Sequence, residues 1–120
     1  MKPKISSTSF GSITVKKKTF ENDIIIRLGG QVEKRRKKLS KKLYGTSHKV
    51  SLEEAKYIYE KGAEKLIMGT GQTGYVELSK KAKKYFRKKD CKVKLFPTPK
   101  AIKIWNKSKG KTIAMFHVTC

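Results

Sequence analysis

The sequence predicts an α/β domain in which an N-terminal β-meander precedes alternating helices and strands. Short apolar runs separated by glycine and lysine turns occupy the first third of the chain. Segments with helical periodicity then alternate with short apolar segments, a pattern typical of parallel-sheet crossover units. A length of 120 residues with 37% hydrophobic side chains is enough for one core, so we expect residues 1–120 to form a single domain.

The expected strands are short apolar or alternating segments bounded by turn residues. They are residues 12–15, 23–27, 31–33, 65–68, 92–96 and 112–116. The lysines at 16–18 predict a turn, and the strands of the first third are expected to pair antiparallel. The basic segment 34–42 separates this region from the helices and has no assigned element.

Three helices are expected, at residues 52–61, 80–89 and 99–108. Ser51 and Glu54 have the spacing of a capping box, and Thr98 places a capping hydroxyl before a first-turn proline. Gly62 and Gly110 follow the first and third helices as left-handed ends. Apolar side chains recur at helical spacing and predict core-facing stripes. The stripes are Leu52, Ala55 and Tyr59; Ala82, Tyr85 and Phe86; and Ala101, Ile102 and Trp105.

The net charge of +22 arises from 31 basic and nine acidic side chains, and lysine accounts for 27 of the basic residues. A field of this size attracts polyanions, so we expect weak binding of RNA or DNA. Lysine is a hydrated point charge, which favours diffuse attraction over specific recognition. The alternative interpretation is a solvated surface. The candidate polyanion surface comprises Arg35, Arg36, Lys37, Lys38, Lys80, Lys81, Lys83 and Lys84.

Polar residues follow several of the expected strands, and ligands of open α/β sheets bind at the carboxyl ends of strands. The candidate ligand rim consists of Thr46, His48, Gly69, Thr70, Gly71, Thr98, His117, Thr119 and Cys120. The direction of the last strand stays open at this point. An antiparallel last strand would carry His117 and Cys120 to the edge opposite the other rim residues.

The rim glycines satisfy the G-x-G-x-x-G dinucleotide pattern between Gly69 and Gly74. The next expected helix begins only after Ser79, too late to direct its N-terminus at a pyrophosphate. A sharp turn is therefore the favoured interpretation, and its exposed amides could hold a smaller anion. We expect no cofactor.

Cys120 with His48 or His117 could form a thiol and base pair, although a packing or tethering role for Cys120 is favoured. The four residues His48, Cys91, His117 and Cys120 match no structural zinc spacing, so we expect no metal site. Two cysteines are too few for a disulfide framework. No apolar run resembles a signal peptide or spans a bilayer, and we expect a cytoplasmic protein without membrane contact.

Five short motifs are similar to those of a known family. They are Phe10-Gly11-Ser12, Tyr44-Gly45-Thr46-Ser47-His48, Gly69-Thr70-Gly71, Pro97-Thr98 with Ala101, and His117-Val118-Thr119-Cys120. In these motifs the chain resembles the archaeal branch of the adipogenesis-associated Mth domain family. The resemblance implies a three-layer α/β domain around a mixed sheet, without a settled biochemical role. Distant mitochondrial relatives assemble respiratory complex I, which implies binding of a protein partner.

The leading functional hypothesis is a non-enzymatic interaction or assembly module that binds a protein or a small anionic ligand at the rim. The first alternative is sequence-tolerant nucleic-acid binding through the lysine-rich surface. The second alternative is thiol-dependent chemistry at Cys120. The residues do not decide between an enzyme and a binding protein, and the balance favours a binding protein.

Overall fold

The computed structural model describes residues 2–120 and has a five-stranded mixed sheet at its centre. In spatial order the strands are β5 (Val32–Lys34), β4 (Ile24–Ile26), β10 (Thr112–His117), β7 (Lys65–Thr70) and β9 (Lys92–Phe96). Strands β10, β7 and β9 run parallel, whereas β4 is antiparallel to both β10 and β5. The direction of the last strand is thereby settled, because β10 runs parallel to its neighbour β7.

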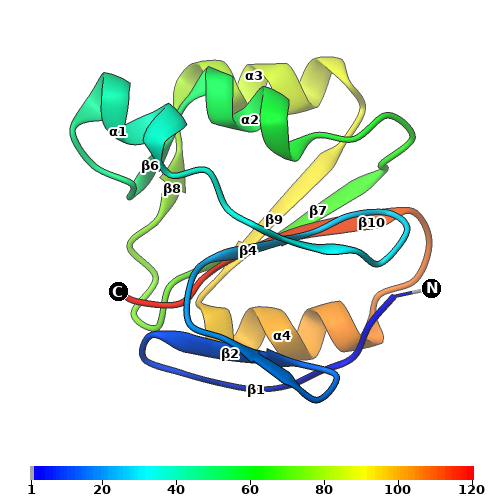
Figure 1. Ribbon diagram of the computed structural model, residues 1–120. Helices are drawn as coiled ribbons and strands as arrows, with labels where there is room; N and C mark the ends of the chain where they lie inside the picture. The colour runs from blue at the N-terminus through cyan, green and yellow to red at the C-terminus, as the bar shows by residue number, and fades with distance from the viewer. Residues whose placement is uncertain (1) are drawn as a thin grey trace.

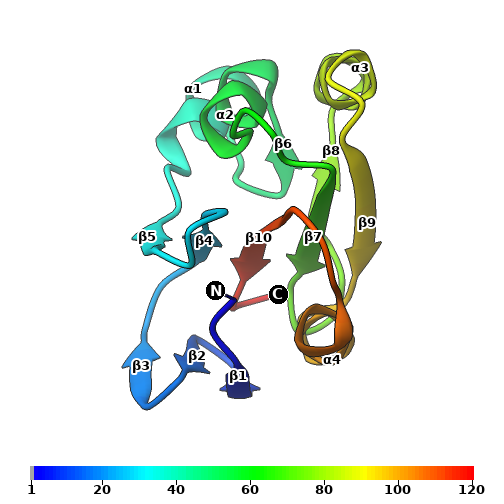
Figure 2. The same ribbon diagram turned by 90° about the vertical axis from the view of Figure 1, so that its right-hand side faces the viewer.

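Helices and a small second sheet cover the two faces of the main sheet (Figures 1 and 2). Three helices lie on one face: α1 (Lys38–Tyr44), α2 (Leu52–Ile58) and α3 (Lys80–Lys88). The other face carries α4 (Thr98–Lys107) and the antiparallel strands β1 (Ile5–Ser9), β2 (Ser12–Val15) and β3 (Lys18–Phe20). A short parallel pair completes the structure, β6 (Lys49–Val50) with β8 (Glu77–Leu78). The three-layer α/β architecture is confirmed.

Two buried clusters hold the layers together, one on each face of the sheet. Successive side chains of a strand point to opposite faces. Met68 and Met115 accordingly pack toward α2 and α3, whereas Ile67 and Phe116 pack toward α4 and β2. Most residues of the predicted helical stripes are buried in these clusters, and Tyr59 and Tyr85 are partly buried against them. Burial on both faces explains why the central strands are continuous apolar runs.

The first expected helix begins as predicted but ends three residues early. The Ser51 hydroxyl accepts the Glu54 backbone N–H at 3.1 Å, as a helix cap should. The Glu54 side chain turns away to Arg35, so the return half of the capping box is absent. Arg27 donates to the carbonyls of residues 57 and 58 at the end of the helix. The extended Tyr59 follows, not the predicted Gly62.

The cap predicted at Thr98 is wrong. Thr98 is the first residue of α4, and its hydroxyl donates to the His117 carbonyl at 2.6 Å instead of capping the helix. Helix α4 ends on the extended residue Ser108, whereas Gly110 lies two residues further along. The hydroxyl of Thr98 therefore joins α4 to the end of β10.

The basic segment 34–42 contains an element that the pattern did not predict. Helix α1 begins without a side-chain cap and has no acidic residue in its first turn, so the usual start signals are missing. It ends on the left-handed Gly45, whose N–H donates to the Lys41 carbonyl. Strands β1, β3, β6 and β8 were also not predicted, and Lys18 of the expected turn is the first residue of β3. The expected meander divides between two sheets, since β1–β3 pair with one another and β4 pairs with β10.

Within residues 2–120 no helix has the length and apolar character needed to cross a membrane.

Candidate functional site

The carboxyl ends of the three parallel strands meet at one edge of the main sheet. Thr70 ends β7, Phe96 ends β9 and His117 ends β10. The loop that carries His48 reaches the same edge because β6 pairs with β8, and the Glu77 N–H donates to the His48 carbonyl at 2.8 Å. Residues from three distant parts of the sequence thus come together.

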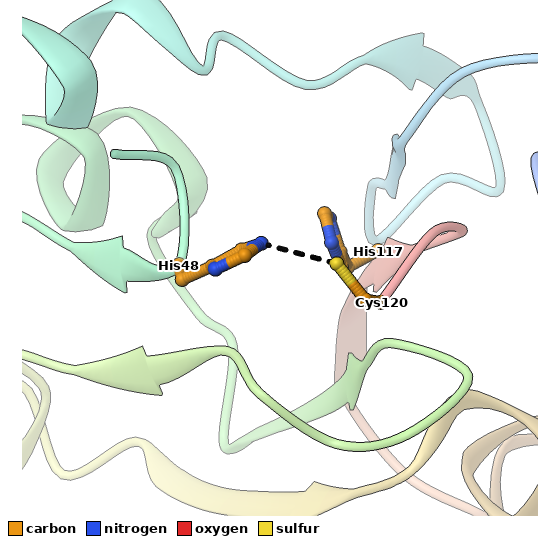
Figure 3. A group of neighbouring side chains, drawn as sticks. All are labelled: His48, His117 and Cys120. Carbon is orange, nitrogen blue, oxygen red and sulfur yellow. Dashed lines mark hydrogen bonds between the residues drawn. The ribbon is translucent and has the colours of Figure 1, made fainter. Parts of the chain in front are cut away.

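His48, His117 and Cys120 form a compact group, which we call the His–Cys cluster (Figure 3). The Cys120 Sγ lies 3.5 Å from the His48 Nε2. The two imidazole rings meet edge to face, with centroids 5.5 Å apart. One nitrogen of each ring and the sulfur all lie within 4.8 Å of one another. The structure therefore brings both histidines and Cys120 to one edge, as a parallel last strand requires.

His117 is oriented by a buried carboxylate. The Asp23 Oδ2 lies 2.7 Å from the His117 Nδ1, and Asp23 Oδ1 accepts the Val118 N–H at 2.8 Å. Burial acts to raise the pKa of Asp23, but the hydrogen bond to His117, the charge of that ring, the hydrogen bond from Val118 and the charge of Arg35 outweigh it and lower the pKa to about 2. Asp23 is therefore ionised at neutral pH and accepts a hydrogen bond from Nδ1. The remaining nitrogen, Nε2, lies 3.0 Å from the Thr119 hydroxyl.

Cys120 is held through the backbone of residues 118–120. The Gln72 N–H donates to the Thr119 carbonyl at 2.6 Å, and the Tyr75 N–H donates to the Cys120 carbonyl at 3.2 Å. Gly71 has φ +112°, and a Cβ there would lie 2.4 Å from the Cys120 backbone. The segment can pass over this turn only because residue 71 has no side chain.

Several backbone amides of the glycine turn are bonded within the protein. The Gly71 N–H donates to the Thr98 hydroxyl at 3.0 Å, and the amides of Gln72 and Tyr75 bond to residues 119 and 120. Three amides of the turn are therefore occupied within the protein and are not free to hold an anion. Gly69 is needed for packing, since a Cβ there would lie 2.7 Å from Phe116.

The threonines of the predicted rim mainly hold backbone in place. The Thr46 hydroxyl accepts the His48 N–H at 3.1 Å, and the Thr70 hydroxyl donates to the Phe96 carbonyl at 3.0 Å. Thr98 bonds both Gly71 and His117. Thr119 alone contacts a ring of the His–Cys cluster through its side chain.

Arg35 does not belong to a polyanion surface, because it is buried beneath the site. Its guanidinium donates to Asp23 at 2.8 Å, to Glu54 and to the Ser47 carbonyl at 2.7 Å. The Ser40 hydroxyl also donates to Glu54. Nothing in the basic run distinguished Arg35 from its exposed neighbours. Asp23 was missed because no motif surrounds it, and Glu54 was predicted only as part of a capping box.

A basic pocket opens beside this buried network. Its volume is about 750 Å³, and Asp23, Val118 and Thr119 are among its lining residues. The basic side chains that line it are Lys34, Arg35, Arg36, Lys37, Lys38 and Lys41. Part of the predicted polyanion surface therefore borders a cavity at the same edge of the sheet. The rest, on α3, is exposed to solvent.

Cys91 lies outside the His–Cys cluster. It is buried in the core between α3 and β9, and burial raises the pKa of its thiol to about 11. A second cavity, of about 530 Å³, lies beside Cys91, Phe86 and Val93 at the edge strand β9. None of the rim residues lines that cavity.

The match to a protein family covers nearly the whole chain. Residues 5–117 match the family described as "Protein of unknown function (DUF498/DUF598)". No protein with a curated description matches. The "conserved hypothetical protein PH1505" from Pyrococcus horikoshii OT3 is 36% identical, with a TM-score of 0.92 over 98% of this chain and 99% of that one.

Two further solved structures are similar. The protein named "MT938" is 33% identical, with a TM-score of 0.82 over 98% of this chain and 99% of that chain. A Bordetella pertussis protein described as a Mth938-like domain is 14% identical, with a TM-score of 0.64 over 97% of this chain and 85% of that chain. This last likeness concerns the fold alone. The chain therefore belongs to the DUF498/DUF598 family of unknown function, and the resemblance of its motifs to the Mth domain family is confirmed.

Proposed function

We propose that this protein is a non-enzymatic binding module that holds a small anionic ligand in the basic pocket. The supporting observation is a cavity of about 750 Å³ with five basic side chains at its solvent side. Cavities of about 300–1,000 Å³ are typical of small-molecule sites. The five residues are Lys34, Arg36, Lys37, Lys38 and Lys41.

The charges of the pocket favour an anion. Asp23 lines the cavity, but its oxygens already bond His117, Val118 and Arg35. Arg35 is balanced by Asp23 and Glu54. The charged groups left to meet a ligand are therefore the four lysines, Arg36 and the single acid Glu21. Lys37 is partly engaged, because its Nζ lies 3.6 Å from Asp23.

An interaction role is supported by two exposed aromatic residues. Phe10 is 72% exposed and Tyr75 is 64% exposed. Each lies on a loop that is hydrogen-bonded to the 118–120 segment. In the Phe10 loop the Gly11 N–H donates to the Val118 carbonyl, and in the Tyr75 loop the Tyr75 N–H donates to the Cys120 carbonyl. A protein partner that displays an anionic group beside apolar side chains would fit this surface.

The test is titration with pyrophosphate, using chloride at equal ionic strength as the reference. We expect pyrophosphate to raise the melting temperature, and calorimetry to give a saturable affinity. Replacing both Lys38 and Lys41 by glutamine should weaken binding at least about tenfold, because each removes a charge-assisted contact.

The matched control replaces Lys100 and Lys103 of α4 by glutamine. These lysines are exposed and have the same spacing in a helix, but they lie on the opposite face of the sheet. The proposal predicts less than about a twofold change for this control, since only the overall charge differs from the wild type. Equal losses in the two double variants would show general charge attraction and contradict a pocket. An affinity for pyrophosphate no greater than for chloride would also contradict it.

Polyanion binding by the helical layer is the second candidate. Helices α1, α2 and α3 form one face of the molecule (Figure 1). A shallow groove between α2 and α3 is lined by four lysines, Lys56, Lys81, Lys84 and Lys88. Lysines along a groove can follow a phosphate backbone without reading its sequence.

A further inference from the structure

We propose that the His–Cys cluster is a zinc site, with His48, His117 and Cys120 as ligands and the fourth position open. The inference concerns a different group of atoms from the basic pocket and does not depend on the anionic ligand. It departs from the expectation of no metal, which rested on sequence spacing. The fold assembles the ligands from a loop, the end of β10 and the 118–120 segment, so no short spacing could show them.

The distances suit a zinc ion. With bonds of about 2.0–2.3 Å, ligand atoms of a tetrahedral zinc centre lie about 3.3–3.8 Å apart. The Cys120 Sγ and the His48 Nε2 are 3.5 Å apart, which already meets this requirement. The cluster as a whole extends over at most 4.8 Å, so closing around an ion needs shifts of about 1 Å. Figure 3 shows the His48 ring directed at Cys120 with His117 beside it.

The contacts of His117 prepare its Nε2 as a ligand. Asp23 accepts a hydrogen bond from Nδ1 at 2.7 Å, so the neutral ring keeps a lone pair on Nε2. A carboxylate that bonds the far nitrogen is the usual partner of a zinc-bound histidine, because it fixes the ring and raises its basicity. The Thr119 hydroxyl now contacts this lone pair at 3.0 Å, and an ion would take its place.

The ligand types favour zinc over a hard cation. Two imidazoles and a thiolate suit zinc, whereas magnesium and calcium require oxygen ligands. The one carboxylate in contact with the cluster, Asp23, is fully engaged by hydrogen bonds. Arg35 and Lys37 both lie within 4 Å of Asp23 and balance the charges of Asp23 and Glu54, so the choice of zinc rests on the ligand types.

The site is open enough for an ion to enter. His48 and Cys120 are half-buried, whereas His117 is buried behind them. Binding would form a zinc–sulfur bond and two zinc–nitrogen bonds, and it would release the proton of the Cys120 thiol to the buffer. Three protein ligands leave the fourth position to water or to another small molecule.

The experiment measures zinc binding to the full chain by competition with a chromophoric chelator. We expect one ion per chain with a Kd below about 1 µM. Cys120→Ser and His48→Ala should each raise the Kd at least about tenfold, because each removes a ligand. Both residues are half-buried, so their replacement is compatible with folding, which circular dichroism checks. Cobalt in place of zinc should give thiolate-to-metal absorption that Cys120→Ser abolishes.

Cys91 provides a matched thiol control. Cys91→Ala should leave the Kd within about twofold, because this thiol lies in the core and outside the cluster. Zinc should also slow alkylation of Cys120 by iodoacetamide, while the buried Cys91 stays unreactive with or without the ion. A Kd above about 1 µM for the wild-type chain would overturn the proposal. An unchanged Kd in both His48→Ala and Cys120→Ser would do so as well, by showing that any zinc is held elsewhere.

Discussion

Two residues, Gly71 and Asp23, hold the 118–120 segment at the site. Asp23 bonds the Val118 N–H at 2.8 Å and the His117 ring at 2.7 Å, so one buried carboxylate fixes both backbone and imidazole. Gly71 leaves the space through which the segment passes. Because Cys120 follows directly, its position relative to His48 depends on both residues.

Replacing Gly71 by alanine should lower the free energy of unfolding by about 2–4 kcal/mol. Adopting φ +112° costs a residue with a Cβ about 1–2 kcal/mol, and the 2.4 Å overlap with Cys120 adds about 1–2 kcal/mol more. Urea unfolding measures the change. Gly45→Ala is the matched control, because Gly45 has φ +72° but no atom within 4 Å of the added carbon. We expect the control to cost only the conformational part, about 1–2 kcal/mol. Equal losses for the two variants would mean that contact with Cys120 is unimportant.

At the scale of elements, α3 and α4 carry lysine triplets of identical spacing on opposite faces of the sheet. Helix α3 has Lys81, Lys84 and Lys88, and α4 has Lys100, Lys103 and Lys107; all six are exposed. The α3 triplet faces the groove with α2, whereas the α4 helix packs beside β1. Comparing variants of the two triplets therefore distinguishes a binding surface on α3 from the effect of net charge.

If the helical layer binds polyanions, changing the α3 triplet to glutamine should weaken binding of single-stranded RNA and duplex DNA more than changing the α4 triplet. Each lost phosphate contact lowers the slope of log K against log salt by about 0.7 for a single strand and 0.9 for a duplex. Fluorescence anisotropy from about 50 to 200 mM salt measures both slopes. Reversing the charges of Lys80, Lys81, Lys83 and Lys84 should enlarge the effect. Identical slopes for the two triplet variants would show that the attraction comes from the net charge alone.

The elements that the sequence predicted well are those with strong local signals. Helix α3 and strands β7, β9 and β10 have apolar periodicity and clear boundaries, and they lie within two residues of the expected ranges. Helix α1 has no side-chain cap at its N-terminus, and β6 and β8 have two residues each. None of these three elements therefore produces a recognisable sequence pattern. The pairing of β10 with β7 is a long-range contact that no local signal can reveal.

The location of the site was predictable from the sequence, but the roles of its residues were not. Polar residues after apolar strands indicated the correct edge of the sheet, because the direction of parallel strands determines where their ends lie. The division of roles among those residues was not predictable. The Thr98 hydroxyl bonds backbone and the Arg35 guanidinium is buried, and both facts depend on partners more than ten residues away. Asp23 became visible only through its contact with His117.

At the scale of the whole molecule, a charge of +22 makes the fold sensitive to acid. Lowering the pH protonates the nine acidic side chains, and the 31 basic side chains then repel one another without compensation. The buried Asp23 adds a specific contribution, since its pKa in the folded state is about 2 against an ordinary value of 3.8. These two effects differ in their response to salt, because salt screens exposed charges more than a buried hydrogen-bonded carboxylate.

Acid unfolding at high salt should therefore isolate the contribution of Asp23. Because its folded pKa lies below the unfolded value, its stabilisation is fully present above pH 3.8 and is lost as the pH falls toward about 2. The shift corresponds to about 2 kcal/mol, so the difference in unfolding free energy between wild type and Asp23→Asn should shrink by about that amount from pH 5 to pH 2. Urea titrations in about 0.5 M salt, where the Debye length is only about 4 Å, measure it with surface repulsion screened. A constant difference across that pH range would show that the contacts with His117, Val118 and Arg35 do not depend on the charge of Asp23.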